Sequence, residues 1–159
     1  MTSLAAKSVH LALDDTLADW ECGSVAAGIN NPEYRRTPGT FQIVTVGATR
    51  RWIEAGAPVA GICGATVGLA QSGLLNDRAH TSSAPEQLAT TGYRGAQHYV
   101  DATAVTDRNV ITAGAELPVD FAREVFARLG IYDDAVLAAW YQFYGEHAPA
   151  GCYALVQQQ

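Results

Sequence analysis

The segment from Pro58 to Leu75 (PVAGICGATVGLAQSGLL) constrains the fold of this chain more than any other part of the sequence. Its first half, Pro58–Cys63, is an apolar run without polar alternation, which is typical of a strand buried on both faces of a parallel sheet. Its second half, Thr66–Leu75, predicts a helix despite two internal glycines. A buried strand that turns directly into a helix indicates an α/β fold.

Short apolar runs alternate with helix-like segments along the rest of the chain. The sequence predicts further strands at Val9–Leu13, at Phe41–Val46 and at Val105–Thr112, the last as a strand or a short hairpin. It predicts further helices at Leu17–Ala27, at Thr49–Ala55, at Pro85–Thr90, from Pro118 to Gly130, and from Asp133 or Asp134 to Tyr144. This alternation predicts a three-layer α/β sandwich with a mostly parallel sheet, formed by residues 1–159 as a single domain.

Composition and charge exclude several classes of function. With 48% hydrophobic and 16% charged residues, the chain can bury a sizeable core. Its net charge is −6 and its arginines are scattered, which argues against a nucleic-acid partner. The longest nearly uncharged stretch, residues 55–71, is broken by four glycines and a proline, so we expect no membrane span, and we expect no signal peptide.

The three cysteines, Cys22, Cys63 and Cys152, are too few and too far apart for a disulfide framework or a metal-binding spacing. This usage fits a protein of the reducing cytoplasm. The sequence also lacks a phosphate-binding glycine loop and a nucleotide fingerprint. We therefore expect neither a metal nor a cofactor.

The stretch Gly61-Ile62-Cys63-Gly64-Ala65 has the spacing of a strand-to-helix turn that presents a nucleophile. Such a turn strains the backbone of the nucleophile, and small residues two positions on either side allow a close passage of the chain. The start of the next helix would favour a thiolate. Since open α/β sheets bind ligands beyond the carboxyl ends of their strands, we predict a reactive Cys63 with oxyanion-binding amides at Gly64 and Ala65. The alternative is an inert buried cysteine.

The segment PVAGICGATVGLAQSGLLNDRAHTS, with LADWE upstream and DRNVITAG and PVDFAREVFARLG downstream, resembles the DJ-1/PfpI superfamily of class I glutamine amidotransferase-like proteins. The resemblance extends from Val9 to about Gly145. It implies a flavodoxin-like sandwich, a homodimer, an elbow cysteine, and a protonated glutamate that donates a hydrogen bond to the thiolate. By motif matching, Cys63 and Glu21 take these two roles. On the sequence alone, Glu21 would be a solvated helix residue.

The histidine of the family pattern does not match cleanly. Many members place a histidine directly after the cysteine or in a short TTH segment, whereas Gly64 follows Cys63 here and the later segment reads RAHTS. His80 lies two positions before the place where the family pattern has its histidine, and Ser82 occupies that place. His80 is therefore a candidate acid or base, with a supporting role as the alternative. His10 and His98 have weaker claims.

The family pattern also contains an internal segment of roughly fifty residues that this chain lacks near Thr49–Arg51. It includes a strand ending in a PGG motif, whose amides can help to form an oxyanion hole. Independently of the family, only about ten residues join the strands at Phe41–Val46 and Pro58–Cys63, which is short for a parallel crossover. Either the segment is omitted from the sequence, which we favour, or a true deletion has rearranged the sheet or recruited strands from a partner.

Two main functions use the same residues. The first is a cysteine-dependent hydrolase or hydratase, or a glyoxalase- or deglycase-like enzyme, that attacks a small electrophilic substrate through a covalent intermediate on Cys63. The second is a redox-sensing or stress-protective protein in which Cys63 oxidises reversibly beside Glu21. A third is a catalytically inactive scaffold that dimerises through apolar helix faces. The expected partners are a small-molecule substrate and a second copy of the chain.

Overall fold

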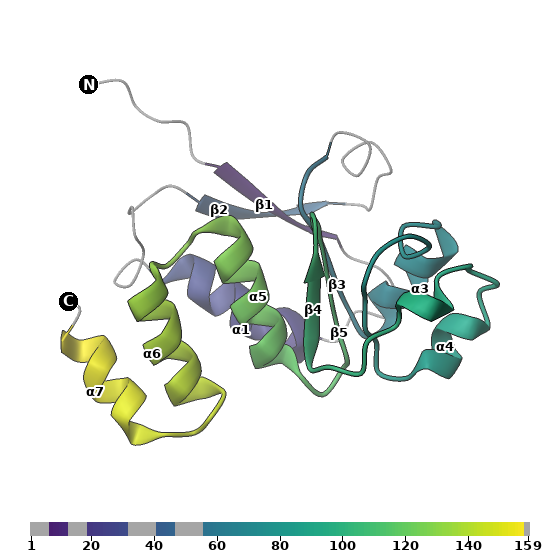
Figure 1. Cartoon of the computed structure of the whole chain (residues 1–159). Coiled ribbons are helices and arrows are strands. Elements are labelled where there is room, and N and C mark those ends of the chain that lie inside the picture. Colours follow the sequence, from purple (N-terminus) through teal and green to yellow (C-terminus); the bar gives the residue numbers. More distant parts are fainter. Residues whose placement is uncertain (1–6, 13–18, 32–40, 47–55, 158–159) are drawn as a thin grey trace.

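The computed structural model describes residues 7–12, 19–31, 41–46 and 56–157 (Figure 1). Five strands and seven helices, one of them a short 3-10 turn, are defined within these ranges. In chain order they are β1 (Lys7–Ala12), α1 (Asp19–Asn30), β2 (Phe41–Val46), β3 (Val59–Ile62), α3 (Gly64–Gln71), α4 (Pro85–Ala89), the 3-10 turn (Ala96–His98), β4 (Ala104–Asp107), β5 (Val110–Ala113), α5 (Pro118–Leu129), α6 (Asp134–Tyr144) and α7 (Pro149–Gln157).

Most predicted elements are present within the described residues, although some differ in extent and one helix was not predicted. The segment predicted as a last strand or hairpin is a hairpin of β4 and β5, and Arg108 in its turn has a φ of 57°. The helix after Cys63 begins at Gly64 and ends at Gln71, before Gly73 with its φ of +78°. Helix α7 was not predicted. The helix expected at Thr49–Ala55 lies outside the described residues.

The described strands form two sheets rather than one. Strands β1 and β2 pair in parallel, from Lys7 opposite Phe41 to Ala12 opposite Val46. In the second sheet β5 is central, parallel to β3 and antiparallel to β4. The mostly parallel pairing is thus confirmed, and the division falls between β2 and β3, in the interval where the sequence predicts the missing strand.

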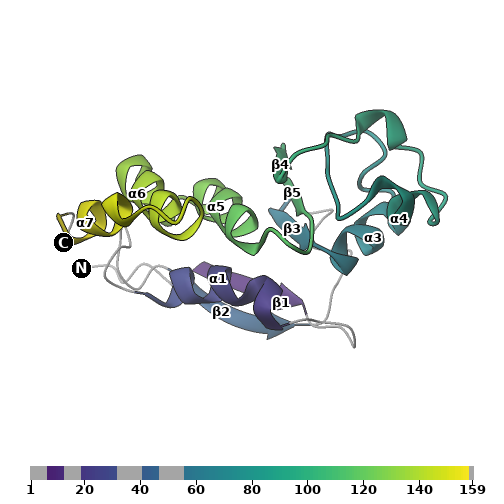
Figure 2. The same ribbon diagram turned by 90° about the horizontal axis from the view of Figure 1, so that it is seen from below.

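Helices cover the three-stranded sheet from two sides. Helix α5 packs against β3, β4 and β5, whereas α3 packs against β3 and α4 on the other side (Figure 2). Helix α1 lies between the two-stranded sheet and α5, and it contacts both β2 and α5. This layering of helices about parallel strands is the flavodoxin-like α/β architecture that the sequence predicted.

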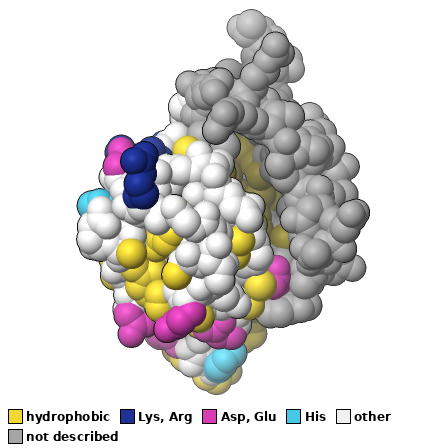
Figure 3. All heavy atoms as spheres, turned by 90° about the vertical axis from the view of Figure 1, so that its right-hand side faces the viewer, with side chains coloured by type: hydrophobic (Ala, Val, Ile, Leu, Met, Phe, Trp, Pro, Cys, Tyr) yellow, Lys and Arg dark blue, Asp and Glu magenta, His cyan; other side chains and the backbone are white. Residues whose placement is uncertain are grey.

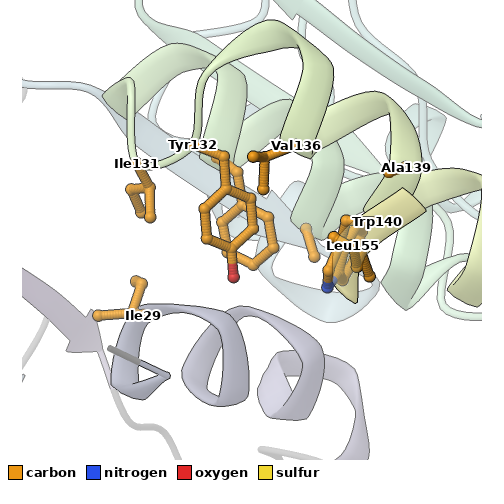
Figure 4. Close-up of a cluster of buried hydrophobic side chains, with 9 residues drawn as sticks. Ile29, Ile131, Tyr132, Val136, Ala139, Trp140 and Leu155 are labelled. Atoms are coloured by element: carbon orange, nitrogen blue, oxygen red, sulfur yellow. The ribbon is translucent and has the colours of Figure 1, made fainter. Parts of the chain in front are cut away.

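The largest apolar cluster lies where α1 meets α5, α6 and α7. Figure 4 shows Ile29 of α1 facing the side chains of the C-terminal helices. The ring of Phe126 lies 5.0 Å from the rings of both Tyr132 and Trp140, and a side chain at Gly28 would overlap it. The close approach of α1 at Gly28 fixes this helix in place. Helix α1 also carries Glu21, so the cluster positions a residue of the candidate site.

Candidate active site at the Cys63 elbow

Cys63 forms a sharp turn between β3 and α3. Its φ of 53° and ψ of −122° are strained values for any residue except glycine. The turn is held from both sides, because the Cys63 N–H donates to the carbonyl of Ala113 at 3.2 Å and the Cys63 carbonyl accepts from the Thr66 N–H at 3.0 Å. The hydroxyl of Thr66 donates to the same carbonyl. The structure therefore contains the strand-to-helix turn that the sequence predicted.

Gly61 lies close to the start of α3. A Cβ atom at Gly61 would lie 2.7 Å from Leu69 Cδ1, at the movable end of that side chain, and 3.5 Å from the Cβ of Ala65. A side chain at position 61 would therefore require Leu69 to shift, while the backbone of the helix stays at ordinary contact distance. Gly64 and Ala65 are both exposed, and their N–H groups stand in the first turn of α3, where a helix leaves amides without partners inside the helix.

The thiol of Cys63 makes a hydrogen bond with the carboxyl group of Glu21. Glu21 lies in the first turn of α1 and is only 7% exposed. Burial, the hydrogen bond to Glu21 and the negative charge of Glu21 raise the pKa of the Cys63 thiol above its ordinary value. The Gly64 N–H lowers this pKa, as the sequence predicted for a helix start, but its effect is outweighed. Taken together, these groups raise the pKa of the Cys63 thiol, which is opposite to the effect expected from the start of α3 alone.

Ser83 is a neighbour of the thiol that the sequence did not reveal. Its side chain forms a hydrogen bond that stabilises the ionised sulfur of Cys63 and so lowers the pKa of the thiol. Its oxygen also accepts from the Ala115 N–H at 2.9 Å. The residue singled out beforehand, Ser82, instead pairs its hydroxyl with that of Thr66 at 2.7 Å. No pattern in the sequence distinguishes these adjacent serines.

His80 occupies a separate buried cluster. It is 0% exposed, and its ring Nδ1 lies 2.8 Å from the carbonyl oxygen of Arg78, which can only accept. In the neutral ring Nε2 then accepts from the Tyr93 hydroxyl at 3.1 Å. The rings of Tyr93 and Tyr99 pack edge-on against it, and burial lowers the pKa of His80. The structure brings Glu21 to Cys63, but it gives His80 other partners.

The two weaker histidine candidates, His98 and His10, lie in different elements of the fold. His98 contributes its backbone carbonyl to the His80 N–H at 3.3 Å, and His10 lies in β1, where only the backbone is described. Within the described ranges, no three His, Cys, Asp or Glu residues are grouped so as to hold a metal. None of the helices in those ranges is long and apolar enough to cross a membrane.

Parallel strands covered by helices, with a strained cysteine at the turn from strand to helix, define the class of α/β proteins that have a strand-to-helix elbow. The chain belongs to the DJ-1/PfpI family, whose model matches residues 25–128. A solved ThiJ/PfpI family protein from Bacillus anthracis is similar with a TM-score of 0.85 and 25% identity, over 98% of each chain. The DJ-1 superfamily protein Atu0886 from Agrobacterium tumefaciens has a TM-score of 0.68 and 30% identity, over 88% of this chain and 97% of its own.

A curated relative, the "uncharacterized protease YoaZ" of Bacillus subtilis strain 168, is 26% identical over 202 residues, covering 94% of this chain and 96% of its own. Since 94% of 159 residues is about 149, about fifty of the 202 aligned positions have no counterpart here. This difference equals the length that the sequence predicts to be absent near Thr49–Arg51. Residues 49–51 lie outside the described part of the chain.

Proposed function

We propose that the protein is a cysteine-dependent hydrolase or hydratase that acts on a small electrophilic carbonyl compound. Cys63 is the nucleophile and Glu21 accepts its proton. One observation carries the proposal, namely a strained elbow cysteine whose thiol is hydrogen-bonded to a buried carboxyl group. The name of the YoaZ relative, a protease, agrees with hydrolytic chemistry. A homodimer, which the family resemblance implies, and a cytoplasmic location, which the cysteine usage suggests, are part of the same proposal.

The chemistry begins from the neutral thiol. As the sulfur bonds to the carbonyl carbon, its proton passes to the Glu21 carboxylate, and the carbonyl oxygen gains a negative charge. The amides of Gly64 and Ala65 at the start of α3 stabilise this oxyanion. When an acyl substrate collapses to a thioester, the leaving group takes the proton from Glu21, and water then releases the acid. With an aldehyde the first step gives a thiohemiacetal.

Redox sensing uses the same cysteine but is less well supported. Oxidation to a sulfenic acid requires the thiolate, and the surroundings of Cys63 raise the pKa of the thiol, which lowers the thiolate population at neutral pH. A nucleophile beside a general base does not need a standing thiolate, because its proton can be removed during the attack. The environment of Cys63 thus favours the enzyme.

Turnover of p-nitrophenyl acetate and of methylglyoxal tests the proposal. We expect Cys63→Ser to lower kcat/KM by at least about 1,000-fold for the substrate that is turned over. Cys152→Ser on α7 is the matched control and should be unchanged. Retention of activity within twofold in Cys63→Ser would overturn the proposal. Selective oxidation of Cys63 by dilute peroxide, without turnover of either compound, would instead favour the redox function.

A further inference from the structure

A pocket of about 310 Å³ opens beside the elbow. The polar residues that line it are Thr81, Ser82, Ser83, Tyr99, Asp101, Thr103 and Glu116. It lies where the segment after α3 meets the loop before β4 and the turn from β5 to α5. The proposed chemistry of Cys63 and Glu21 uses none of these residues.

Ser83 joins this pocket to the reactive sulfur. Its side chain lines the pocket and also forms a hydrogen bond with the Cys63 side chain. Because the Ala115 N–H donates to the Ser83 oxygen, the serine keeps its own hydroxyl proton for the sulfur. Ser83 therefore borders both the reactive sulfur and the pocket.

The walls of the pocket are fixed by hydrogen bonds. The Thr81 hydroxyl donates to the carbonyl of Ala102 at 3.1 Å, which ties the segment after α3 to the loop before β4. The Tyr99 hydroxyl donates to the carbonyl of Ser82 at 3.1 Å. On the opposite side, the Ala115 N–H is bonded to Ser83. The cavity is thus shaped before a ligand arrives, as binding sites usually are.

The charge of the lining is negative. Asp101 and Glu116 both contribute to it, and no Lys, Arg or His is among the described residues that do. The carboxyl group of Glu116 lies close to Gly114, where an added Cβ atom would be 3.0 Å and 3.1 Å from its two oxygens. Gly114 directly follows Ala113, whose carbonyl binds the Cys63 N–H. Figure 3 shows acidic side chains gathered at the lower edge of the face that carries α3 and α4.

We propose that this pocket binds the part of the substrate beyond the reacting carbonyl, and that it selects a cationic group, such as an ammonium, over an anionic one. Asp101 and Glu116 attract the cation, while the hydroxyls of Ser83 and Thr103 accept hydrogen bonds from it. This inference rests on the proposed function, because it assigns the substrate of Cys63. It goes beyond that function in naming the charge of the substrate.

Chemical labelling tests the pocket without turnover. Two methanethiosulfonate reagents, one carrying a trimethylammonium group and one a sulfonate, are reacted with the full chain, and the rate at Cys63 is read by peptide mass spectrometry. The ratio of the two rates is divided by the same ratio for free glutathione. We expect a cationic preference of at least about tenfold, which falls at least threefold in Asp101→Asn/Glu116→Gln and weakens with added salt.

The control is Glu146→Gln, which removes an exposed carboxylate that follows α6 and does not line the pocket. It should leave the ratio unchanged. The uncharged reagent methyl methanethiosulfonate should label Cys63 at equal rates in the three proteins, which shows that the site is folded. An equal ratio in the parent chain and the double variant, with the uncharged rate preserved, would overturn the proposal.

Turnover then separates the two proposals. p-Nitrophenyl esters of glycine, propionate and succinate present an ammonium, a neutral and a carboxylate tail, and we expect kcat/KM to fall in that order. If the labelling ratio shifts as expected but no ester or aldehyde is turned over, the proposed function fails and the cation-selecting pocket stands. If Cys63-dependent turnover is found with no preference among tails, the pocket proposal fails and the function stands.

Discussion

The elbow at Cys63 and the cluster around His80 are both polar sites, but their environments differ. His80 is fully buried, and each of its ring nitrogens has a partner. Cys63 is only partly buried and has a strained backbone, with a carboxyl and a hydroxyl group on its thiol. A buried polar group whose hydrogen bonds are all made contributes to structure. A strained group beside an open pocket can react.

A hydrogen-bonded path nevertheless joins the two regions. Tyr99 pairs with His80 in a parallel bridge and donates its hydroxyl to the Ser82 carbonyl. The Ser82 hydroxyl bonds that of Thr66, which in turn bonds the Cys63 carbonyl. The His80 cluster therefore supports the backbone of the elbow. Substitutions at the two sites should separate chemistry from support.

The largest effect is expected at Glu21. Glu21→Gln removes the proton acceptor while preserving the shape of the side chain, and should lower kcat by about 1,000-fold, or about 4 kcal/mol in the barrier. Steady-state kinetics on the substrate identified for Cys63 measure it. Glu86→Gln, an exposed residue of α4, is the matched control. Unchanged kcat in Glu21→Gln would remove Glu21 from the chemistry.

A smaller effect of a different kind is expected at His80. His80→Ala leaves the Arg78 carbonyl and the Tyr93 hydroxyl without their buried partner, and should lower the free energy of unfolding by about 3 kcal/mol. Urea denaturation measures the loss. At a temperature where the variant is folded, kcat/KM should stay within about threefold of the parent, because the substitution weakens the packing behind the elbow but leaves Cys63 and Glu21 in place. A 100-fold loss of kcat with normal stability would place His80 in the reaction.

Relief of the elbow strain should give a gain of about 1 kcal/mol. Glycine adopts the φ of 53° at position 63 without penalty, whereas alanine shares the strain of cysteine. Cys63→Gly should therefore be more stable than Cys63→Ala by about 1 kcal/mol in thermal denaturation. Equal stability of the two variants would mean that the turn carries no strain.

The smallest effect is on the pH dependence of stability. Burial lowers the pKa of His80, so the folded protein keeps the ring neutral at a pH where the unfolded chain protonates it. The contribution of the neutral His80 ring to the stability of the folded protein is complete above the ordinary pKa of 6.5. It is lost as the pH falls through the lower pKa of the folded protein. Unfolding free energies measured in steps below pH 7 should decline more in the parent than in His80→Asn. Parallel curves would contradict this assignment.

The elements that the sequence predicted well carry local signals. Pro118 opens α5, Gly130 ends it with a φ of 62°, and the Asp133 side chain caps α6 by accepting from the Val136 N–H at 2.9 Å. Helix α7 also opens with a proline, Pro149, so a signal of the same kind was present there and was missed. The strand-to-helix turn at Cys63 was predicted because its spacing is local.

The surroundings of Cys63 were predictable only in part. Glu21 was found through the family motif, since its contact with Cys63 joins residues forty-two positions apart. The bond from Ala115 to Ser83 spans 32 positions, and no local pattern encodes it. His80 became a candidate because it lies near the position of the histidine in the family pattern. Its real partners, Arg78 and Tyr93, follow from how the segment after α3 folds back.

The pH dependence of Cys63 alkylation by iodoacetamide, compared between the parent chain and Glu21→Gln, tests the central claim most directly. Glu21 raises the pKa of the thiol through its hydrogen bond and charge, and in the proposed mechanism it also accepts the proton of the thiol. Glu21→Gln should therefore lower the apparent pKa of alkylation and speed labelling at pH 7, while turnover falls. An unchanged alkylation profile, or turnover that rises together with labelling, would contradict the account.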